Sequence, residues 1–200
     1  MREMQTFRGM KHMTRETLTG IIGPMFSRKT TRLVEIYDSL NPESTMIFKP
    51  DMDNRYGVNT VGTHDGEIRP AIACRTAEEI IAYMGPRTLE VALIDEAQFF
   101  DAELVRVADE LVNNGVRVYF TALNQNYLGR PFNFKDSARH IGELIASADT
   151  IEARTAICDI CNGPATKTQR LIGLDQEVLV GGAEAYTARC AKHHSSRLRL

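Results

Sequence analysis

The sequence has no tryptophan, no long apolar run and almost no net charge. No segment approaches the roughly 18 consecutive apolar residues that a membrane-spanning helix needs. The first residues carry basic groups but lack the apolar stretch of a signal peptide. The 24 basic and 26 acidic side chains leave a net charge of −2, unlike the basic field of most nucleic-acid-binding proteins. We therefore expect a cytoplasmic protein with neither a membrane nor a nucleic acid as its partner.

Cysteine is also scarce, and three of the four cysteines gather near the C-terminus. Cys158-x-x-Cys161 is followed, after a longer gap, by Cys190-x-x-His193. Two pairs with this spacing predict a closed, tetrahedral Cys₃His site for a structural Zn²⁺. His194 is an alternative to His193 as the fourth ligand. The alternatives to metal binding are a labile disulfide or four unpaired surface residues.

Apolar patterns along the chain predict an α/β fold. Short apolar runs predict strands at 17–22, 44–48, 89–94 and 116–123, and apolar residues at helical spacing predict helices at 30–40, 76–84 and 101–114. Strands that alternate with helices predict a parallel sheet with right-handed crossovers and helices on both faces. The polar, glycine-containing stretch at 51–66 is expected to be a long loop of the kind that is usually functional or mobile. Beyond residue 150 the helical periodicity fades, which indicates a second, smaller lobe.

The segment between the first strand and the first helix carries groups suited to phosphate. Backbone N–H groups at a helix N-terminus, a lysine and a hydroxyl bind nucleotide phosphates and Mg²⁺, and Lys29 and Thr30 supply the last two. We predict a P-loop, as in P-loop NTPases, formed by Gly23, Pro24, Met25, Phe26, Ser27, Arg28, Lys29 and Thr30. Arg28 stands where the usual pattern has glycine, at a cost of roughly 1–2 kcal/mol if φ is positive there. A chance turn that opens a basic helix is the alternative interpretation.

Two adjacent carboxylates follow the apolar strand at 89–94. In P-loop enzymes an acid at the end of a neighbouring strand completes the Mg²⁺ site, and Asp95 fits this role directly or through a water. Glu96 can then act as a general base on the phosphate acceptor. The alternative is that both acids simply favour the start of a helix. The phosphate-loop pattern upstream favours a site.

In combination, these motifs resemble those of the zinc-containing, P-loop thymidine kinases. The matching segments begin with GPMFSxKT, IDEAQFF, CxxC and RCxxH. Further segments follow the family's order, and they are 49–56, 63–66, 122–132, 168–171 and 181–186. The resemblance extends from about Leu18 to His193, nearly the whole chain.

The resemblance implies a transfer of the γ-phosphate of ATP, with Mg²⁺, to the 5′-hydroxyl of thymidine or deoxyuridine. Lys29, Thr30 and Asp95 would then serve ATP and its metal, Glu96 would be the base, and Arg55 would stabilise the transferring phosphate. The thymine site would be walled by Phe99, Tyr127, Phe132, Thr168 and Tyr186, and backbone amides at 174–182 would contact the base. The family also implies a homo-oligomer, commonly a tetramer.

These implications give three expected units: a mobile N-terminal extension at 1–16, a P-loop nucleotide-binding domain at 17–150, and a zinc-ribbon lobe with a nucleoside-enclosing loop at 151–200. One rival hypothesis is a catalytically weakened or inactive nucleotide-binding relative, because Arg28 replaces the glycine. A second is a zinc ribbon that binds nucleic acid, which the mixed charges of the lobe disfavour. Asn124 is a further departure, since the family usually has aspartate there. Core packing is the alternative role for the aromatic residues. Solvated or structural charge is the expected role of Arg154, Arg170 and Arg189.

Overall fold

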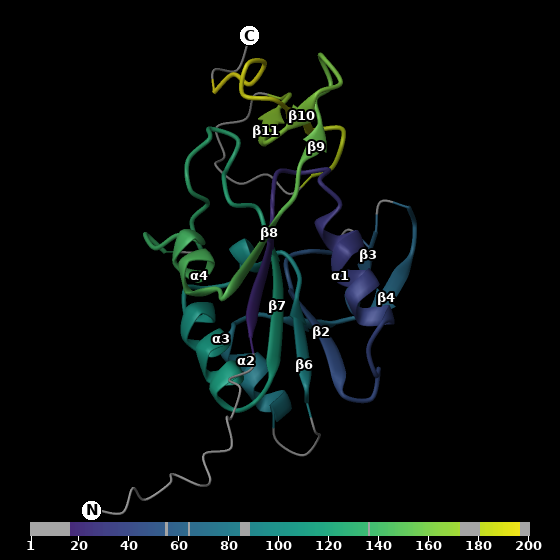
Figure 1. Ribbon diagram of the computed structural model, residues 1–200, viewed down its shortest axis with the longest axis vertical. Helices are drawn as coiled ribbons and strands as arrows, with labels where there is room; N and C mark the ends of the chain where they lie inside the picture. The colour runs from purple at the N-terminus through teal and green to yellow at the C-terminus, as the bar shows by residue number, and fades with distance from the viewer. Residues whose placement is uncertain are drawn as a thin grey trace, which may run out of the picture.

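The structure is a computed structural model, and it describes residues 17–54, 56–63, 65–84, 89–135, 137–172 and 181–196. The expected extension at 1–16, the expected catalytic Arg55 and most of the 174–182 stretch lie outside the described residues. Within the described part, no helix is long and apolar enough to cross a membrane. Figure 1 shows a central sheet flanked by helices, with a smaller lobe beyond one end of the strands.

The central sheet has six strands, all parallel, in the order β5-β2-β6-β7-β1-β8. The strands are β1 (Leu18–Ile22), β2 (Thr45–Pro50), β5 (Ile72–Cys74), β6 (Val91–Ile94), β7 (Arg117–Ala122) and β8 (Thr150–Ala153). The predicted parallel sheet is therefore confirmed. Its first, second, third and fourth predicted strands correspond to β1, β2, β6 and β7, while β5 and β8 were not predicted as parts of it.

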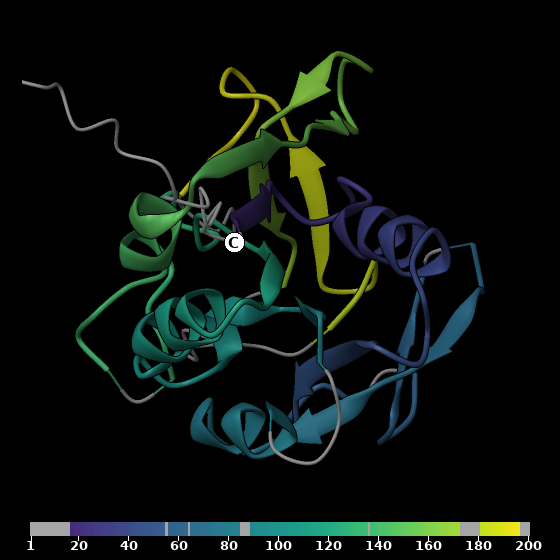
Figure 2. The ribbon, with the colours of Figure 1, turned by 60° about the horizontal axis from the view of Figure 1, so that its bottom comes forward.

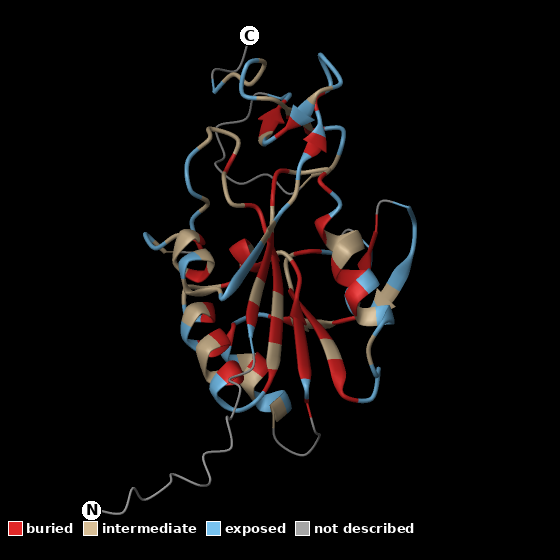
Figure 3. Cartoon of the chain, viewed as in Figure 1, coloured by how far each residue is buried: buried red, intermediate tan, exposed pale blue. Residues whose placement is uncertain are grey.

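Helices cover both faces of this sheet, as the alternating pattern predicted (Figures 1 and 2). Helix α1 (Lys29–Asp38) packs its Leu33 and Val34 with strand residues such as Ile21 and Leu93 on one face. The other face carries α2 (Glu78–Ile81), α3 (Leu104–Asn113), α4 (Gly142–Ser147) and the short 3₁₀ turns η1 (Ala82–Met84) and η2 (Ala97–Phe99). Because successive strand residues point to opposite faces, Leu93 joins the α1 core and Ile94 joins the α3 core. Figure 3 shows the buried strands between these two layers.

The expected long loop at 51–66 is partly ordered into a hairpin. Strand β3 (Thr60–Gly62) pairs antiparallel with β4 (Ile68–Pro70). The buried Lys49 side chain donates from Nζ to the backbone carbonyls of Asp53, Gly57 and Thr60 at 2.6, 2.6 and 2.8 Å. These three bonds fix the segment that leads from β2 to the hairpin.

The C-terminal lobe consists of two short antiparallel pairs: β9 (Ala156–Ile157) with β10 (Pro164–Ala165), and β11 (Lys167–Arg170) with β12 (Tyr186–Arg189). Its buried apolar cluster is small, and its members are Ala156, Cys158, Ala165 and Ala188. So little apolar area cannot by itself offset the entropy of ordering the lobe. Strand β8 pairs with β1, so the main sheet continues to Ala153, beyond the expected boundary at residue 150.

Candidate functional site

A cavity of about 250 Å³ lies where the carboxyl ends of the central strands meet the lobe. Its walls include the segment from Met25 to Thr30, together with Asp53, Asp95 and Glu96. Ligands of open α/β sheets bind at this end of the strands. The structure thus brings together the two motifs that the sequence placed there.

The predicted phosphate loop follows β1 and leads directly into α1, which begins at Lys29. Ser27 Oγ and Lys29 Nζ both donate to the carbonyl oxygen of Pro24, each at 2.8 Å. The loop also holds two non-glycine residues in the left-handed region, Phe26 at φ 64° and Arg28 at φ 60°. The sequence predicted strain at Arg28 if its φ is positive, and this φ is indeed positive. Phe26 is a second strained position, which the motif did not indicate.

The Arg28 side chain extends away from the helix start toward the β3–β4 hairpin. Its Nη2 donates to Oδ2 of Asp65 at 2.6 Å, and both side chains are 60% exposed. An ion pair with this exposure contributes about 0–1 kcal/mol because solvent screens it. The pair therefore does not offset the whole backbone cost of a left-handed arginine.

Asp95 follows β6 and is almost fully buried. Strand β7 lies between β6 and β1, so the acid and the phosphate loop belong to second-neighbour strands rather than adjacent ones. Thr121 of β7 fills this gap by donating from Oγ1 to Oδ1 of Asp95 at 2.5 Å. Thr30 Oγ1 lies 3.2 Å from both Asp95 carboxylate oxygens. A hydroxyl and a carboxylate in contact are oxygen ligands of the type that Mg²⁺ prefers.

Glu96 adopts a left-handed backbone at φ 51°, which turns it out of the strand direction and into the cavity wall. Its backbone N–H donates to Thr121 Oγ1 at 2.9 Å. Its carboxylate Oε2 accepts a hydrogen bond from Nε2 of the fully buried Gln98 at 2.6 Å. Gln98 is held in turn, because its Oε1 accepts from the backbone N–H of Leu123 at 2.9 Å.

Thr121 and Gln98 are site residues that the sequence reasoning missed. The signal for Gln98 was its place in the IDEAQFF segment. Its role could not be inferred from that place, because the sequence does not show which group its amide contacts. Thr121 carried no signal at all, since a threonine in a strand is ordinary.

The five residues expected around the base do not line this cavity. Phe99 and Phe132 meet edge to face, with ring centroids 5.5 Å apart and planes at 87°. Tyr127 lies under the guanidinium of Arg170, whose Cζ is 4.9 Å from the ring centroid. Gly182, which belongs to the segment expected to contact the base, does line the cavity, beside Ala183.

Thr168 and Tyr186 belong to the lobe, where they are buried on β11 and β12. Thr168 Oγ1 accepts a hydrogen bond from the backbone N–H of Met25 at 3.0 Å, so it contacts the phosphate loop. Of the two roles expected for Arg170, the burial of its side chain favours the structural one over the solvated one. Arg154 is structural: Nη1 donates to Glu152 at 2.8 Å, and Nε donates to the carbonyl of Ser27 at 3.4 Å.

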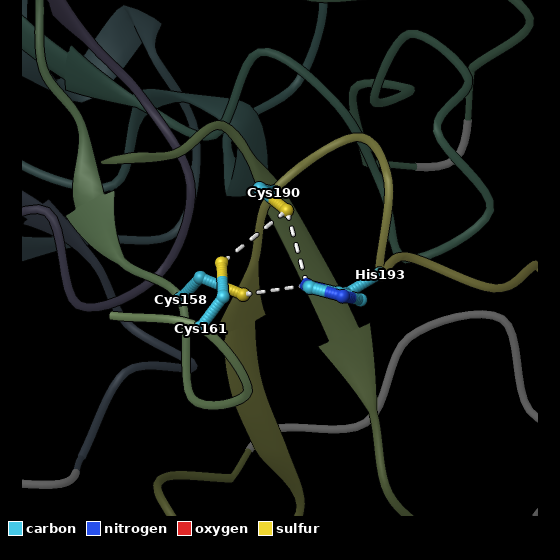
Figure 4. Close-up of side chains that lie close together, drawn as sticks. All are labelled: Cys158, Cys161, Cys190 and His193. Carbon is cyan, nitrogen blue, oxygen red and sulfur yellow. Dashed lines mark hydrogen bonds between the residues drawn. The ribbon is translucent and has the colours of Figure 1, made fainter. Parts of the chain in front are cut away.

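The four predicted zinc ligands converge in the lobe (Figure 4). The ligand atoms of Cys158, Cys161, Cys190 and His193 all lie within 4.8 Å of one another. Nδ1 of His193 is 3.6 Å from Sγ of Cys158 and 3.3 Å from Sγ of Cys190. Three thiols and one imidazole at these separations fit a tetrahedral Zn²⁺ site.

The environment of the first thiol is already suited to a thiolate. Burial raises the pKa of Cys158, but hydrogen bonds from the backbone N–H groups of Cys190, Ile160 and Cys161 and from the His193 ring lower it to about 6 overall. His194 points elsewhere, with its Nε2 2.9 Å from the carbonyl oxygen of Tyr127. The choice between the two histidines that the sequence left open therefore falls on His193.

Comparisons with known proteins agree with these motifs. A family model described as thymidine kinase matches residues 16–194. The thymidine kinase of Deinococcus radiodurans is 37% identical over 185 residues, which cover 84% of each chain. Among solved structures, the Legionella pneumophila ATPase DotB matches 66% of this chain with 17% identity and a TM-score of 0.38, and this chain spans about a third (34%) of that protein.

Proposed function

The chain belongs to the thymidine kinase family, and from this membership we propose that it transfers the γ-phosphate of ATP to the 5′-hydroxyl of thymidine. The products are ADP and thymidine monophosphate. One observation carries the proposal most strongly. Lys29, Thr30, Asp95 and Glu96 come from two distant motifs and line one cavity at the carboxyl end of the sheet.

The ATP side of the reaction rests on Lys29 and Thr30. The Lys29 ammonium is held at the helix start by the Pro24 carbonyl, within the loop whose N–H groups would face the phosphates. Thr30 and Asp95 would hold Mg²⁺, which neutralises charge on the phosphates when bound. Thr121 keeps the Asp95 carboxylate oriented toward Thr30 through its 2.5 Å hydrogen bond.

The nucleoside side rests on Glu96 as the general base. The base must accept the proton of the 5′-hydroxyl as its oxygen attacks the γ-phosphorus. Gln98 donates to carboxylate Oε2 of Glu96, which fixes the orientation of the carboxylate in the cavity wall. A fixed carboxylate lowers the entropic cost of reaching the reactive geometry.

Further parts of the proposal rest on the family resemblance. Arg55 would stabilise charge on the transferring phosphate, and the thymine site would be walled by Phe99, Tyr127, Phe132, Thr168 and Tyr186. The base would be read by backbone amides of the 174–182 stretch, of which Gly182 lines the cavity. Deoxyuridine is a second substrate under this proposal, and a homotetramer is the proposed assembly.

The Cys₃His cluster is proposed to hold a structural Zn²⁺. Four protein ligands close the coordination sphere and leave no position for a substrate, so the ion would stabilise the lobe rather than take part in catalysis. A metal site built from reduced cysteines also supports the cytoplasm as the compartment.

The proposal is tested by a coupled assay that follows ADP formation with ATP, Mg²⁺ and a panel of nucleosides. We expect turnover with thymidine, slower or equal turnover with deoxyuridine, and none with purine nucleosides. A protein that binds ATP but phosphorylates no nucleoside would instead support the rival hypothesis of an inactive relative.

A further inference from the structure

The phosphate loop and the zinc lobe share an apolar contact. Phe26 of the loop packs against the small apolar cluster of the lobe, which contains the metal ligand Cys158 and is also contacted by Cys190. The same side chain lines the nucleotide cavity. Phe26 thus packs against the lobe's apolar cluster and also lines the cavity of the proposed phosphate site.

Three polar or steric contacts join the same two regions. The Met25 backbone N–H donates to Thr168 Oγ1 of β11 at 3.0 Å. Arg154, which leads from β8 into the lobe, donates from Nε to the Ser27 carbonyl at 3.4 Å. Gly23 packs so closely on the same segment that a Cβ there would lie 2.5 Å from the Arg154 carbonyl oxygen. With Phe26, four positions of the phosphate loop therefore contact the lobe or the segment that leads into it.

The backbone of the loop shows why such support is needed. Phe26 and Arg28 both occupy the left-handed region; each such residue costs of order 1–3 kcal/mol, and the conformation persists only where its surroundings fix it. The partly buried contact with the lobe supplies that fixation for Phe26. Without an ordered lobe, the strained loop would relax, and its N–H groups would no longer converge on a phosphate.

We propose that the Cys₃His centre sets the shape of the phosphate loop through Phe26, so that zinc binding and nucleotide binding favour each other. Phe26 is then a positioning residue for phosphate. This inference rests on the proposed function, since it assigns the loop to ATP and the cluster to zinc.

Linkage gives a test that does not depend on turnover. If zinc strengthens nucleotide binding, the nucleotide must strengthen zinc binding by the same factor. Zinc affinity is measured at equilibrium by competition with a zinc-selective chelator, with and without a saturating non-hydrolysable ATP analogue, at fixed Mg²⁺. We expect the analogue to raise the zinc affinity of the parent protein by about fivefold or more.

Variants then locate the coupling. Phe26→Ala should reduce the effect of the analogue to about twofold or less, and Phe26→Leu should restore most of it because leucine refills the apolar contact. Thr168→Val, which removes one hydroxyl at constant volume, should weaken the coupling by a smaller factor. Ile157→Ala is the matched control, since Ile157 precedes a zinc ligand but is 71% exposed, and its coupling should equal that of the parent.

The outcomes separate the inference from the function on which it rests. If direct titration shows that the analogue binds the parent but leaves its zinc affinity unchanged, the inference is wrong and the kinase proposal stands. Equal loss of coupling in Ile157→Ala and Phe26→Ala would also refute it, because the contact would then have no special part. If the analogue does not bind the parent at all, the proposed function itself fails and the inference fails with it.

Discussion

Glu96 is the residue on which the proposed chemistry depends most directly, and its replacement gives the first prediction. Glu96→Gln keeps the size and the contact with Gln98 but cannot accept a proton. We expect turnover to fall by about 10²–10⁴-fold, the range for a lost general base, while the Kd for thymidine changes little. Steady-state kinetics and titration measure the two quantities, with the exposed Glu43→Gln as control. Near-normal turnover would transfer the role to another acid, and Asp53, which lines the same cavity, is the next candidate.

Arg28 gives a second prediction at this scale. Its left-handed backbone suits glycine, and its exposed pair with Asp65 offsets little of the strain. We expect Arg28→Gly to raise turnover with thymidine by at least about tenfold, equivalent to about 1.4 kcal/mol of recovered positioning.

Asp65→Asn is the matched control for Arg28→Gly, because it removes the ion pair and keeps the strained backbone. We expect it to change turnover by less than about threefold. An unchanged or lower turnover in Arg28→Gly would mean that the arginine is accommodated or useful, and the hypothesis of a weakened enzyme would lose its support.

The two adjacent histidines give the third prediction. His193 faces the three thiols, whereas His194 contacts the Tyr127 carbonyl. We therefore expect His193→Ala to lose its zinc during purification and His194→Ala to retain one zinc per chain, as measured by metal analysis. Retention of zinc by His193→Ala would assign the fourth ligand position to another residue.

At the scale of elements, the strands and helices that the sequence predicted well are those whose own pattern determines their environment. The continuous apolar run before Asp95 predicted a strand, and all four residues of β6 are buried, as is usual for a parallel strand that is covered on both faces. Helix α3 carries the expected apolar stripe but begins at Leu104 rather than residue 101. The Asp101 carboxylate accepts hydrogen bonds from the Ala77 and Glu103 backbone N–H groups, so it joins α3 to the turn before α2.

The elements that the sequence missed depend on their neighbours. Strand β5 has three residues, and β8 is largely exposed on its surface. Neither carries a periodic signal, and each becomes a strand because an adjacent strand offers hydrogen bonds. The helix α4 was missed because six residues are too few for a clear helical period.

The residues of the candidate site also divide into those that the sequence predicted and those whose role depends on the fold. Lys29, Thr30, Asp95 and the zinc ligands were predictable, because each belongs to a motif with fixed spacing. Thr121 was not, because its contact with Asp95 arises only when β7 lies beside β6. Gln98 was not, because the bond from the Leu123 backbone that holds it also needs the end of β7 nearby. The left-handed Phe26 was also unpredictable, since nothing in its type indicates a positive φ.

At the scale of the whole molecule, the cores differ greatly in size. Two large apolar clusters hold the helices on the two faces of the sheet, whereas the lobe has a cluster of four small buried residues. The structural metal of a small lobe contributes to its folding free energy directly, by about 10–16 kcal/mol in isolated zinc-finger peptides. The main sheet has no such need, since its layers bury ample apolar surface.

This difference gives the last prediction, which concerns metal removal. A strong chelator should unfold the lobe and leave the sheet folded, because only the lobe depends on zinc for its core. Limited proteolysis should then cut after about residue 153, where β8 ends, while far-ultraviolet circular dichroism keeps most of its helical signal. Returning one equivalent of Zn²⁺ should restore protection, and Cys161→Ala should behave like the chelated protein without any chelator. A metal-free protein that stays resistant to protease throughout the lobe would show that the hairpins fold without the ion, and the Cys₃His cluster would lose its structural role.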